Sequence, residues 1–146
     1  MGLNTIFDIA GSGMNAQSVR LNTTASNIAN AESAASSSGE VYKGRHPVFQ
    51  ASFNNMLGNP NFNAGGNDGQ SAGVEVAGIV ESDAPLQKRY EPGHPLADEE
   101  GYVYYPNVNV VEEMANMISA SRSFQVNVEV MNSAKQMVQR VLTLGQ

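Results

Sequence analysis

The fold is decided by the stretch NVVEEMANMISASRSFQVNVEVMNSAKQMVQRVL, residues 109–142, in which apolar side chains recur at alternating spacings of four and three. This spacing aligns one side chain per turn along one stripe of an α-helix, the pattern of a helix–helix seam. Asn109 can cap the first turn, and Glu112 meets the positive end of the helix dipole. The stretch therefore predicts a helix about 50 Å long. Its expected seam runs through Val110, Met114, Met117, Ser121, Phe124, Val128, Met131, Lys135, Val138 and Leu142.

A weaker stripe of the same spacing crosses the N-terminal region and predicts a helix about 40 Å long. Gly11 and Gly13 each cost about 1 kcal/mol relative to Ala in a helix interior. Small and polar residues also interrupt the stripe, so this helix is expected to need a partner. The stripe runs through Leu3, Phe7, Ala10, Met14, Gln17, Leu21, Thr24 and Ile28.

Between the two helices the apolar spacing becomes irregular or alternating, which favours β-strands. A β-leaning stretch from 41 to 53 precedes a tract rich in Asn and Gly at 54–73, which we interpret as a flexible loop. Residues 74–80 alternate as a strand, and residues 86–90 continue toward a turn at Pro92–Gly93. A further strand is expected at 101–105.

These elements predict an α+β fold, in which long N- and C-terminal helices pair as a coiled-coil-like hairpin around a small β-rich insert with a flexible loop. Residues 1–30 are expected to form the N-terminal helix of an inner core domain, and residues 107–146 its C-terminal helix. Residues 31–106 form the β-rich middle region. At 146 residues the chain is sufficient for one such unit.

The composition excludes several classes of function. Eight basic and fourteen acidic residues give a net charge of −6, and no basic stripe is present that could neutralise a nucleic-acid backbone. No apolar run approaches the length that membrane insertion requires. The chain has no cysteine, and its first residues lack the basic start and cleavage site of a secretory signal peptide. Charged residues make up only 15% of the chain, which suits interfaces that exclude charge from their centres.

The densest cluster of polar residues surrounds His94. A metal-dependent hydrolase using His94 with Asp98 and Glu99 is one hypothesis, but prolines flank the histidine and no helical spacing aligns these ligands. We interpret the segment as a Pro-Gly turn with a solvated acidic loop. Neither a phosphate loop nor a nucleophile elbow is present, so the sequence indicates no enzyme and no cofactor.

Three motifs resemble those of the axial rod and hook proteins of the bacterial flagellum, in particular the C-type proximal rod subunits of the basal body. ASNIANA at 25–31 is similar to the N-terminal motif that rod, hook and hook-associated proteins share. YEPGHPLADEEGYV at 90–103 is similar to the proximal rod subunits more specifically. PNVNVVEEM at 106–114, followed by Met117, Ile118 and Ser121-Arg122, is similar to the C-terminal helix signature of the family.

The resemblance implies a structural subunit that is exported through the flagellar type III export apparatus without a cleaved signal and that polymerises into the rod crossing the periplasm. It implies as partners copies of the chain itself, other proximal rod subunits and the distal rod protein. A coiled-coil adaptor or secretion chaperone that binds another protein is the alternative. The residues expected at the assembly interface are Phe7, Met14, Leu21, Asn27, Ile28, Asn30, Met114, Met117, Ile118, Arg122, Phe124, Val128, Met131 and Val138.

Overall fold

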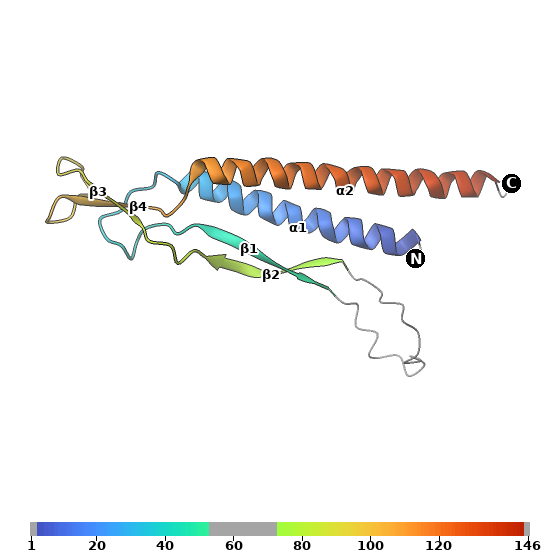
Figure 1. The fold of residues 1–146 in the computed structure, drawn as a ribbon, viewed down its shortest axis with the longest axis horizontal. Helices are drawn as coiled ribbons and strands as arrows, with labels where there is room; N and C mark the ends of the chain where they lie inside the picture. The colour runs from blue at the N-terminus through green and yellow to red at the C-terminus, as the bar shows by residue number, and fades with distance from the viewer. Residues whose placement is uncertain (1–2, 53–72, 145–146) are drawn as a thin grey trace, which may run out of the picture.

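The computed structural model describes residues 3–52 and 73–144, which form an elongated molecule (Figure 1). The expected flexible loop at 54–73 lies outside these residues except for Gly73. Two long helices and two small antiparallel sheets make up the predicted α+β fold. In chain order the elements are α1 (Leu3–Asn30), β1 (Arg45–Ala51), β2 (Val74–Glu81), β3 (Gln87–Tyr90), β4 (Tyr102–Tyr105) and α2 (Val110–Leu144).

The two helices lie antiparallel along the length of the molecule, and both chain ends lie at the same end (Figure 1). Arg20 Nη2 donates a hydrogen bond of 2.9 Å to Asn116 Oδ1, and Gly13 lies against the Asn127 side chain. Extending this register pairs the start of α1 with roughly residue 136, so about the last two turns of α2 project beyond α1. Leu142 on these turns is accordingly 67% exposed.

The first sheet is a hairpin that covers the side of α1 turned away from α2 (Figure 1). β1 pairs with β2 from Arg45↔Glu81 to Ala51↔Val74, with a bulge between Val48 and Phe49. Ser12 Oγ on α1 accepts a hydrogen bond of 3.0 Å from the Val74 amide at the start of β2. α1 is therefore the middle layer of the molecule, between α2 and this hairpin.

The second sheet, β3 paired with β4, lies at the end of the molecule where α2 begins (Figure 1). Ala35 adds an isolated bridge to Tyr104 on β4, and Val103, the residue before Tyr104, is completely buried. Gly101 adopts φ +83° just before β4, in a space where an added Cβ would lie 3.0 Å from the Tyr90 ring. Both its backbone conformation and its surroundings therefore require glycine.

The start of α2 follows the predicted cap. Asn109 Oδ1 accepts a hydrogen bond of 3.1 Å from the Val111 amide, and its carbonyl accepts one of 3.0 Å from the Glu113 amide. These bonds satisfy donors that a helix N-terminus leaves unpaired. The helix consequently begins at Val110, one residue after the cap.

Candidate assembly surface

Half of the predicted α2 seam is displaced by one residue. Ala120 and Ala134 are 0% and 1% exposed, whereas the seam predicted Ser121 and Lys135 at these turns, and Lys135 is exposed. Small side chains let two helices approach closely, so alanines occupy the tightest points of the contact with α1. The other half of the seam is half-buried, as a stripe shared with α1 requires. Its residues are Met117, Phe124, Met131 and Val138.

α1 is buried more broadly than its predicted seam, because it packs on two sides. Ala10 and Thr24 belong to the predicted stripe and are buried. Ala16, Thr23 and Asn27 are also buried, although they lie on a different face of the helix. This second buried face explains why a single heptad stripe describes α1 incompletely.

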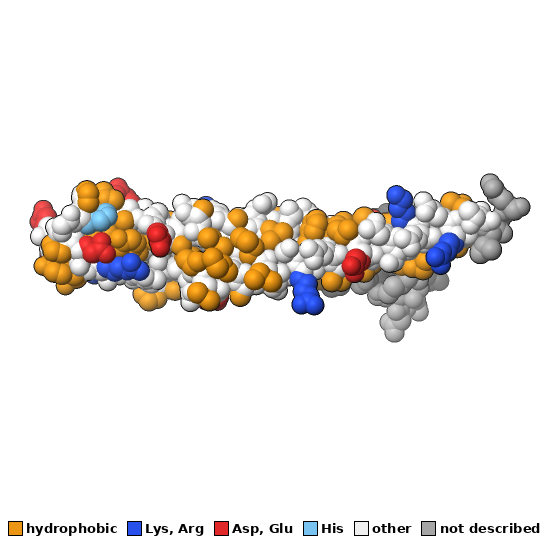
Figure 2. Space-filling model, turned by 90° about the horizontal axis from the view of Figure 1, so that it is seen from above, with side chains coloured by type: hydrophobic (Ala, Val, Ile, Leu, Met, Phe, Trp, Pro, Cys, Tyr) orange, Lys and Arg blue, Asp and Glu red, His pale blue; other side chains and the backbone are white. Residues whose placement is uncertain are grey.

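α2, by contrast, packs on α1, with a single side-chain approach of Glu113 to His46 on β1 among the described helices and strands, and its outer face is uncovered. Val111, Met114 and Ile118 on this face are 76%, 51% and 69% exposed. Figure 2 looks onto this side of the molecule and shows hydrophobic side chains spread along it, densest over the half nearer the β3–β4 end. Contiguous exposed apolar surface of this kind marks a surface that binds another protein.

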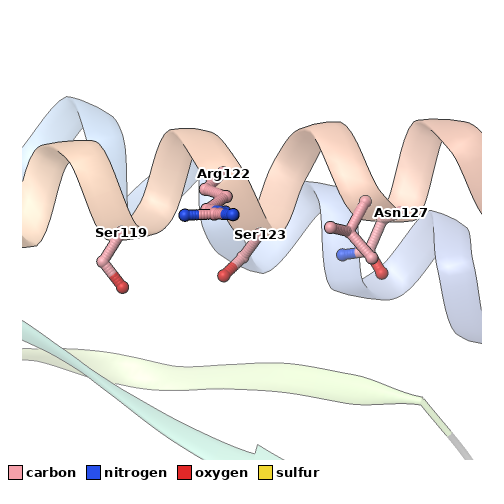
Figure 3. Close-up of a pocket in the computed structure, with 5 residues that line it drawn as sticks. Ser119, Arg122, Ser123 and Asn127 are labelled. Atoms are coloured by element: carbon pink, nitrogen blue, oxygen red, sulfur yellow. The ribbon is translucent and has the colours of Figure 1, made fainter.

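Two shallow grooves run along α2 near its midpoint. The first, of about 380 Å³, is lined by Ser119, Arg122, Ser123, Val126 and Asn127. Figure 3 shows the side chains of Ser119 and Ser123 projecting from the same edge of the helix. The second, of about 400 Å³, is lined by Phe124, Gln125, Val128 and Glu129. At 100° per residue, Ser119 and Ser123 lie on one flank and Phe124 and Val128 on the opposite one.

Asn27, in the middle of the ASNIANA motif, joins α1 to the start of β1. It is completely buried, and its Nδ2 donates to the Arg45 carbonyl at 2.8 Å. Its Oδ1 accepts from the Arg45 amide at 2.9 Å and from the Tyr42 hydroxyl at 2.8 Å. Asn27 therefore lies inside the subunit instead of on the surface at which we expected it, while Asn30 bonds locally to the Ser26 carbonyl.

A second asparagine, Asn107, makes a similar junction that the sequence analysis missed as an individual site. Its Oδ1 accepts from the Gly44 amide at 2.8 Å, and its Nδ2 donates to the Ser82 and Ala84 carbonyls at 3.1 and 2.8 Å. Asn27 and Asn107 thus hold two adjacent residues of one segment. Only their place in family motifs could have singled them out.

Glu113, in the first turn of α2, is also buried, at 5% exposure. Its Oε1 lies 4.0 Å from His46 Nδ1, and its Oε2 is buried with no hydrogen-bond partner among the residues that the structure describes. The heptad pattern placed Met114 in the seam at this turn, so the sequence analysis missed Glu113. Its carboxylate near the positive end of the helix dipole is favoured there even without a full set of partners.

The β3–β4 hairpin carries an aromatic cluster at the end of the molecule. The Tyr90 and Tyr102 rings pack edge to face at 5.2 Å, and Lys88 Nζ lies 4.0 Å from the centre of the Tyr102 ring. Loss of solvent, followed by the nearby Glu91 carboxylate, raises the pKa of Tyr105, whose hydroxyl donates to Glu91 Oε2 at 3.2 Å. The cluster stabilises the hairpin as a rigid tip.

The polar residues around His94 serve the turn that links β3 to β4. His94 Nδ1 accepts from the Leu96 amide at 3.1 Å, and Asp98 Oδ1 accepts from the Glu100 and Tyr102 amides at 3.0 and 2.7 Å. Within residues 3–52 and 73–144, no three His, Cys, Asp or Glu side chains are grouped so that they could hold a metal ion. The geometry therefore favours the interpretation of this segment as a turn.

The predicted interface residues fall into three groups. Met114, Ile118 and Arg122 are exposed on α2, and Asn27 is buried inside the subunit. The rest are partly exposed along the two helices, where they can contact both the paired helix and a neighbouring molecule. They are Phe7, Met14, Leu21, Ile28, Asn30, Met117, Phe124, Val128, Met131 and Val138. No helix of the described chain has an apolar stretch long enough to cross a membrane.

Comparison with known families matches both ends of the chain. The family described as flagella basal body rod protein matches residues 7–32, which include ASNIANA. The family described as flagellar basal body rod FlgEFG protein C-terminal matches residues 99–144, which include β4 and α2. The two matched regions coincide with the two helices that form the long axis of the molecule.

Individual relatives match over the whole chain. The flagellar basal-body rod protein FlgC of Escherichia coli O6:H1 is 51% identical over 146 residues, with all of both chains covered. FlgC of Salmonella typhimurium is 50% identical over 147 residues with the same coverage, and FlgC of Borreliella burgdorferi is 38% identical over 151 residues, covering all of this chain and 99% of the relative. The predicted family is thereby confirmed, and the chain belongs to the FlgC family of flagellar basal-body rod proteins, which are structural subunits of the rod.

Proposed function

We propose that this rod subunit polymerises through α1 and α2, so that the helices of many copies pack side by side into the wall of the proximal rod. In this arrangement the β1–β2 and β3–β4 hairpins face outward. The rod then acts as a drive shaft that transmits torque across the periplasm. The observation that carries the proposal is the uncovered apolar face of α2, with Val111 and Ile118 more than two-thirds exposed.

Burial of this face supplies the energy of assembly. Covering a Val, Ile or Met side chain fully stabilises a contact by about 1.5–3 kcal/mol, so a few such side chains per contact drive polymerisation. Only two charged residues, Asp8 and Arg20, lie on α1. Little charge on α1 therefore has to lose its solvent when the helices come together, whereas the exposed charges among the six charged residues of α2 have to stay solvated or find partners.

The neighbours follow from the same surfaces. Copies of this chain are one class of neighbour. Other proximal rod subunits and the distal rod protein are the other classes, and they can contact the projecting end of α2, where Val141 and Leu142 are uncovered. Before assembly the chain passes through the flagellar type III export apparatus without cleavage of a signal peptide. Mass spectrometry of the chain from isolated rods tests this route, because a cleaved leader would shorten the N-terminus.

Polar substitution on the outer face of α2 tests the proposal. In a strain lacking its own copy of the gene, Ile118→Asp should abolish rod completion and swimming, because each contact would then bury an unpaired carboxylate. Ile118→Leu is the matched control and should keep both, because it preserves an apolar side chain of the same volume. Normal rods with Ile118→Asp would contradict the proposal, provided that both variants accumulate to the same level.

A further inference from the structure

Near the midpoint of α2, its outer ridge carries two opposite charges that have no partner within the described chain. Arg122 and Glu129 are both exposed, and neither makes an ion pair or a side-chain hydrogen bond with residues 3–52 or 73–144. They lie seven residues apart, so they point in directions about 20° apart and are separated by about 10 Å along the helix. An ion pair within one helix needs a spacing of three or four residues, which these two do not have.

Each charge borders a different groove. Arg122 lines the groove with Ser119, Ser123 and Val126, and Glu129 lines the one with Phe124 and Val128 on the opposite flank. Both charges stand on the ridge between the grooves, the cation at the edge of the groove lined by small polar side chains and the anion at the edge of the groove lined by apolar ones. The charge at the edge of one groove is therefore complementary to the charge at the edge of the other groove, whereas two grooves of the same kind would bring like charges together.

We propose that Arg122 of one subunit pairs with Glu129 of the next copy of this chain, the cationic flank of α2 packing against the anionic flank of its neighbour. This inference rests on the proposed function, because it names the partner of the surface through which the rod polymerises. Contact between two different flanks is heterologous, and a heterologous contact that does not close extends into an open helical array. A self-complementary contact would instead stop at a dimer.

The spacing of the charges also sets the offset between neighbours. When one operation relates all copies, their α2 helices point the same way along the rod. Arg122 then meets Glu129 only if the neighbour is displaced along its helix by about seven residues, or about 10 Å. Val126, which is 52% exposed beside Arg122, is covered in the same contact.

Charge reversal tests the pairing in assembled rods. Arg122→Glu and Glu129→Arg should each lower the number of rods in isolated basal bodies at least fivefold, because each creates a like-charged contact at every subunit boundary. The double variant R122E/E129R should restore rod number to within twofold of the parent. Glu75→Lys, which reverses an exposed charge on β2 and therefore away from the outer ridge of α2, is the control and should stay within twofold.

Failure of the double variant to restore assembly, or an equal defect in Glu75→Lys, would overturn the pairing. The same strains separate this result from failure of the proposed function. If Ile118→Asp stops assembly while the double variant is not rescued, only the pairing is wrong. If Ile118→Asp rods are normal, polymerisation through α2 is itself wrong.

Cross-linking provides an independent readout, because the chain contains no cysteine. In rods of the double variant R122C/E129C, oxidation should yield a ladder of covalent oligomers. A bridge within one chain is impossible, since residues about 10 Å apart on a helix exceed the Cα separation of roughly 4.4–6.8 Å that a disulfide allows. The single variants Arg122→Cys and Glu129→Cys are controls and should remain monomeric. Dimers from either single variant would show a two-fold contact and overturn the proposal.

Discussion

α1 and α2 are both long helices with few charges, yet the chain covers them unequally. α1 packs on α2 on one side and on the β1–β2 hairpin on another, and five of its residues are buried. α2 is the longer helix, but it packs mainly on α1 and leaves large apolar side chains such as Ile118 exposed. The difference teaches that α1 holds the subunit together, whereas α2 keeps a face for other molecules. Substitutions in α1 should therefore act on folding, and substitutions on the outer face of α2 on assembly.

The largest effect on folding should come from Asn27→Ala, because it removes the three hydrogen bonds of a completely buried side chain, to the Arg45 amide, the Arg45 carbonyl and the Tyr42 hydroxyl. We expect the free energy of unfolding to fall by about 3 kcal/mol. Urea unfolding followed by tyrosine fluorescence measures this, since all five tyrosines lie between the two helices. Asn22→Ala, an exposed site on the same helix, should change it by less than about 0.5 kcal/mol. Equal effects would contradict the role of α1 as the middle layer.

The next effect tests the close contact between the helices. Ala120→Leu adds three carbon atoms where the side chain is completely buried, and should lower the free energy of unfolding by about 2 kcal/mol through overpacking. Ala115→Leu makes the same change at an exposed position of α2 and should be close to neutral. Urea unfolding of the two purified variants compares them directly. A tolerated Ala120→Leu would show that the helices do not pack at this register.

Two glycines of α1 should respond in opposite ways. Gly11 has no atom within 4 Å of an added Cβ, so Gly11→Ala should stabilise the chain by about 1 kcal/mol through its helix propensity. At Gly13 the added Cβ would lie 2.8 Å from Asn127 Nδ2, so the crowding should cancel this gain or exceed it. The difference between the two melting temperatures measures the effect. If both variants gain equally, Asn127 does not pack on Gly13.

The smallest effect on the free energy of unfolding should come from a substitution on the exposed surface of the β1–β2 hairpin. Arg45 Nη2 lies 3.1 Å from Glu81 Oε1, but both side chains are about half exposed, so Glu81→Gln should cost less than about 0.5 kcal/mol. Urea unfolding of Glu81→Gln and of Asn27→Ala, measured side by side, checks this ranking of their free energies of unfolding. A cost as large as that of Asn27→Ala would mean that the surface ion pair, and not the buried asparagine, attaches the hairpin.

Much of the fold was predictable, because element boundaries depend on local signals. Alternation and turn residues predicted all four strands, and the cap at Asn109 placed the start of α2 near the residue where it lies. The seam of α2 was less accurate, because the strict alternation of four and three placed Ser121 and Lys135 at turns where the preceding residue faces α1. Ala120 and Ala134 face it instead, while Met114 is exposed. A hydrophobic pattern shows which side chains tend to be buried, but it does not show whether the same chain or a neighbouring molecule buries them.

The polar junctions could not be predicted for a different reason. Asn27 bonds to backbone groups of Arg45, 18 residues away in the sequence, and Asn107 to the amide of Gly44, 63 residues away. Such bonds depend on how the segments cross in space, and the spacing of apolar residues along the sequence does not show this. The motifs marked these residues, and the structure supplies the physical reason why they have to be asparagine: each uses both the amide nitrogen and the oxygen of its side chain.

The most direct test of the central claim is the reactivity of a single thiol on the outer face of α2. Because the chain has no cysteine, Ile118→Cys introduces the only one, at a position 69% exposed in the subunit. A maleimide should label it rapidly in the purified monomer and at least a hundredfold more slowly in isolated rods, with rapid labelling restored after the rods are dissociated. Equal labelling rates in monomer and rod would contradict the account, because the outer face of α2 would then remain open to solvent after assembly.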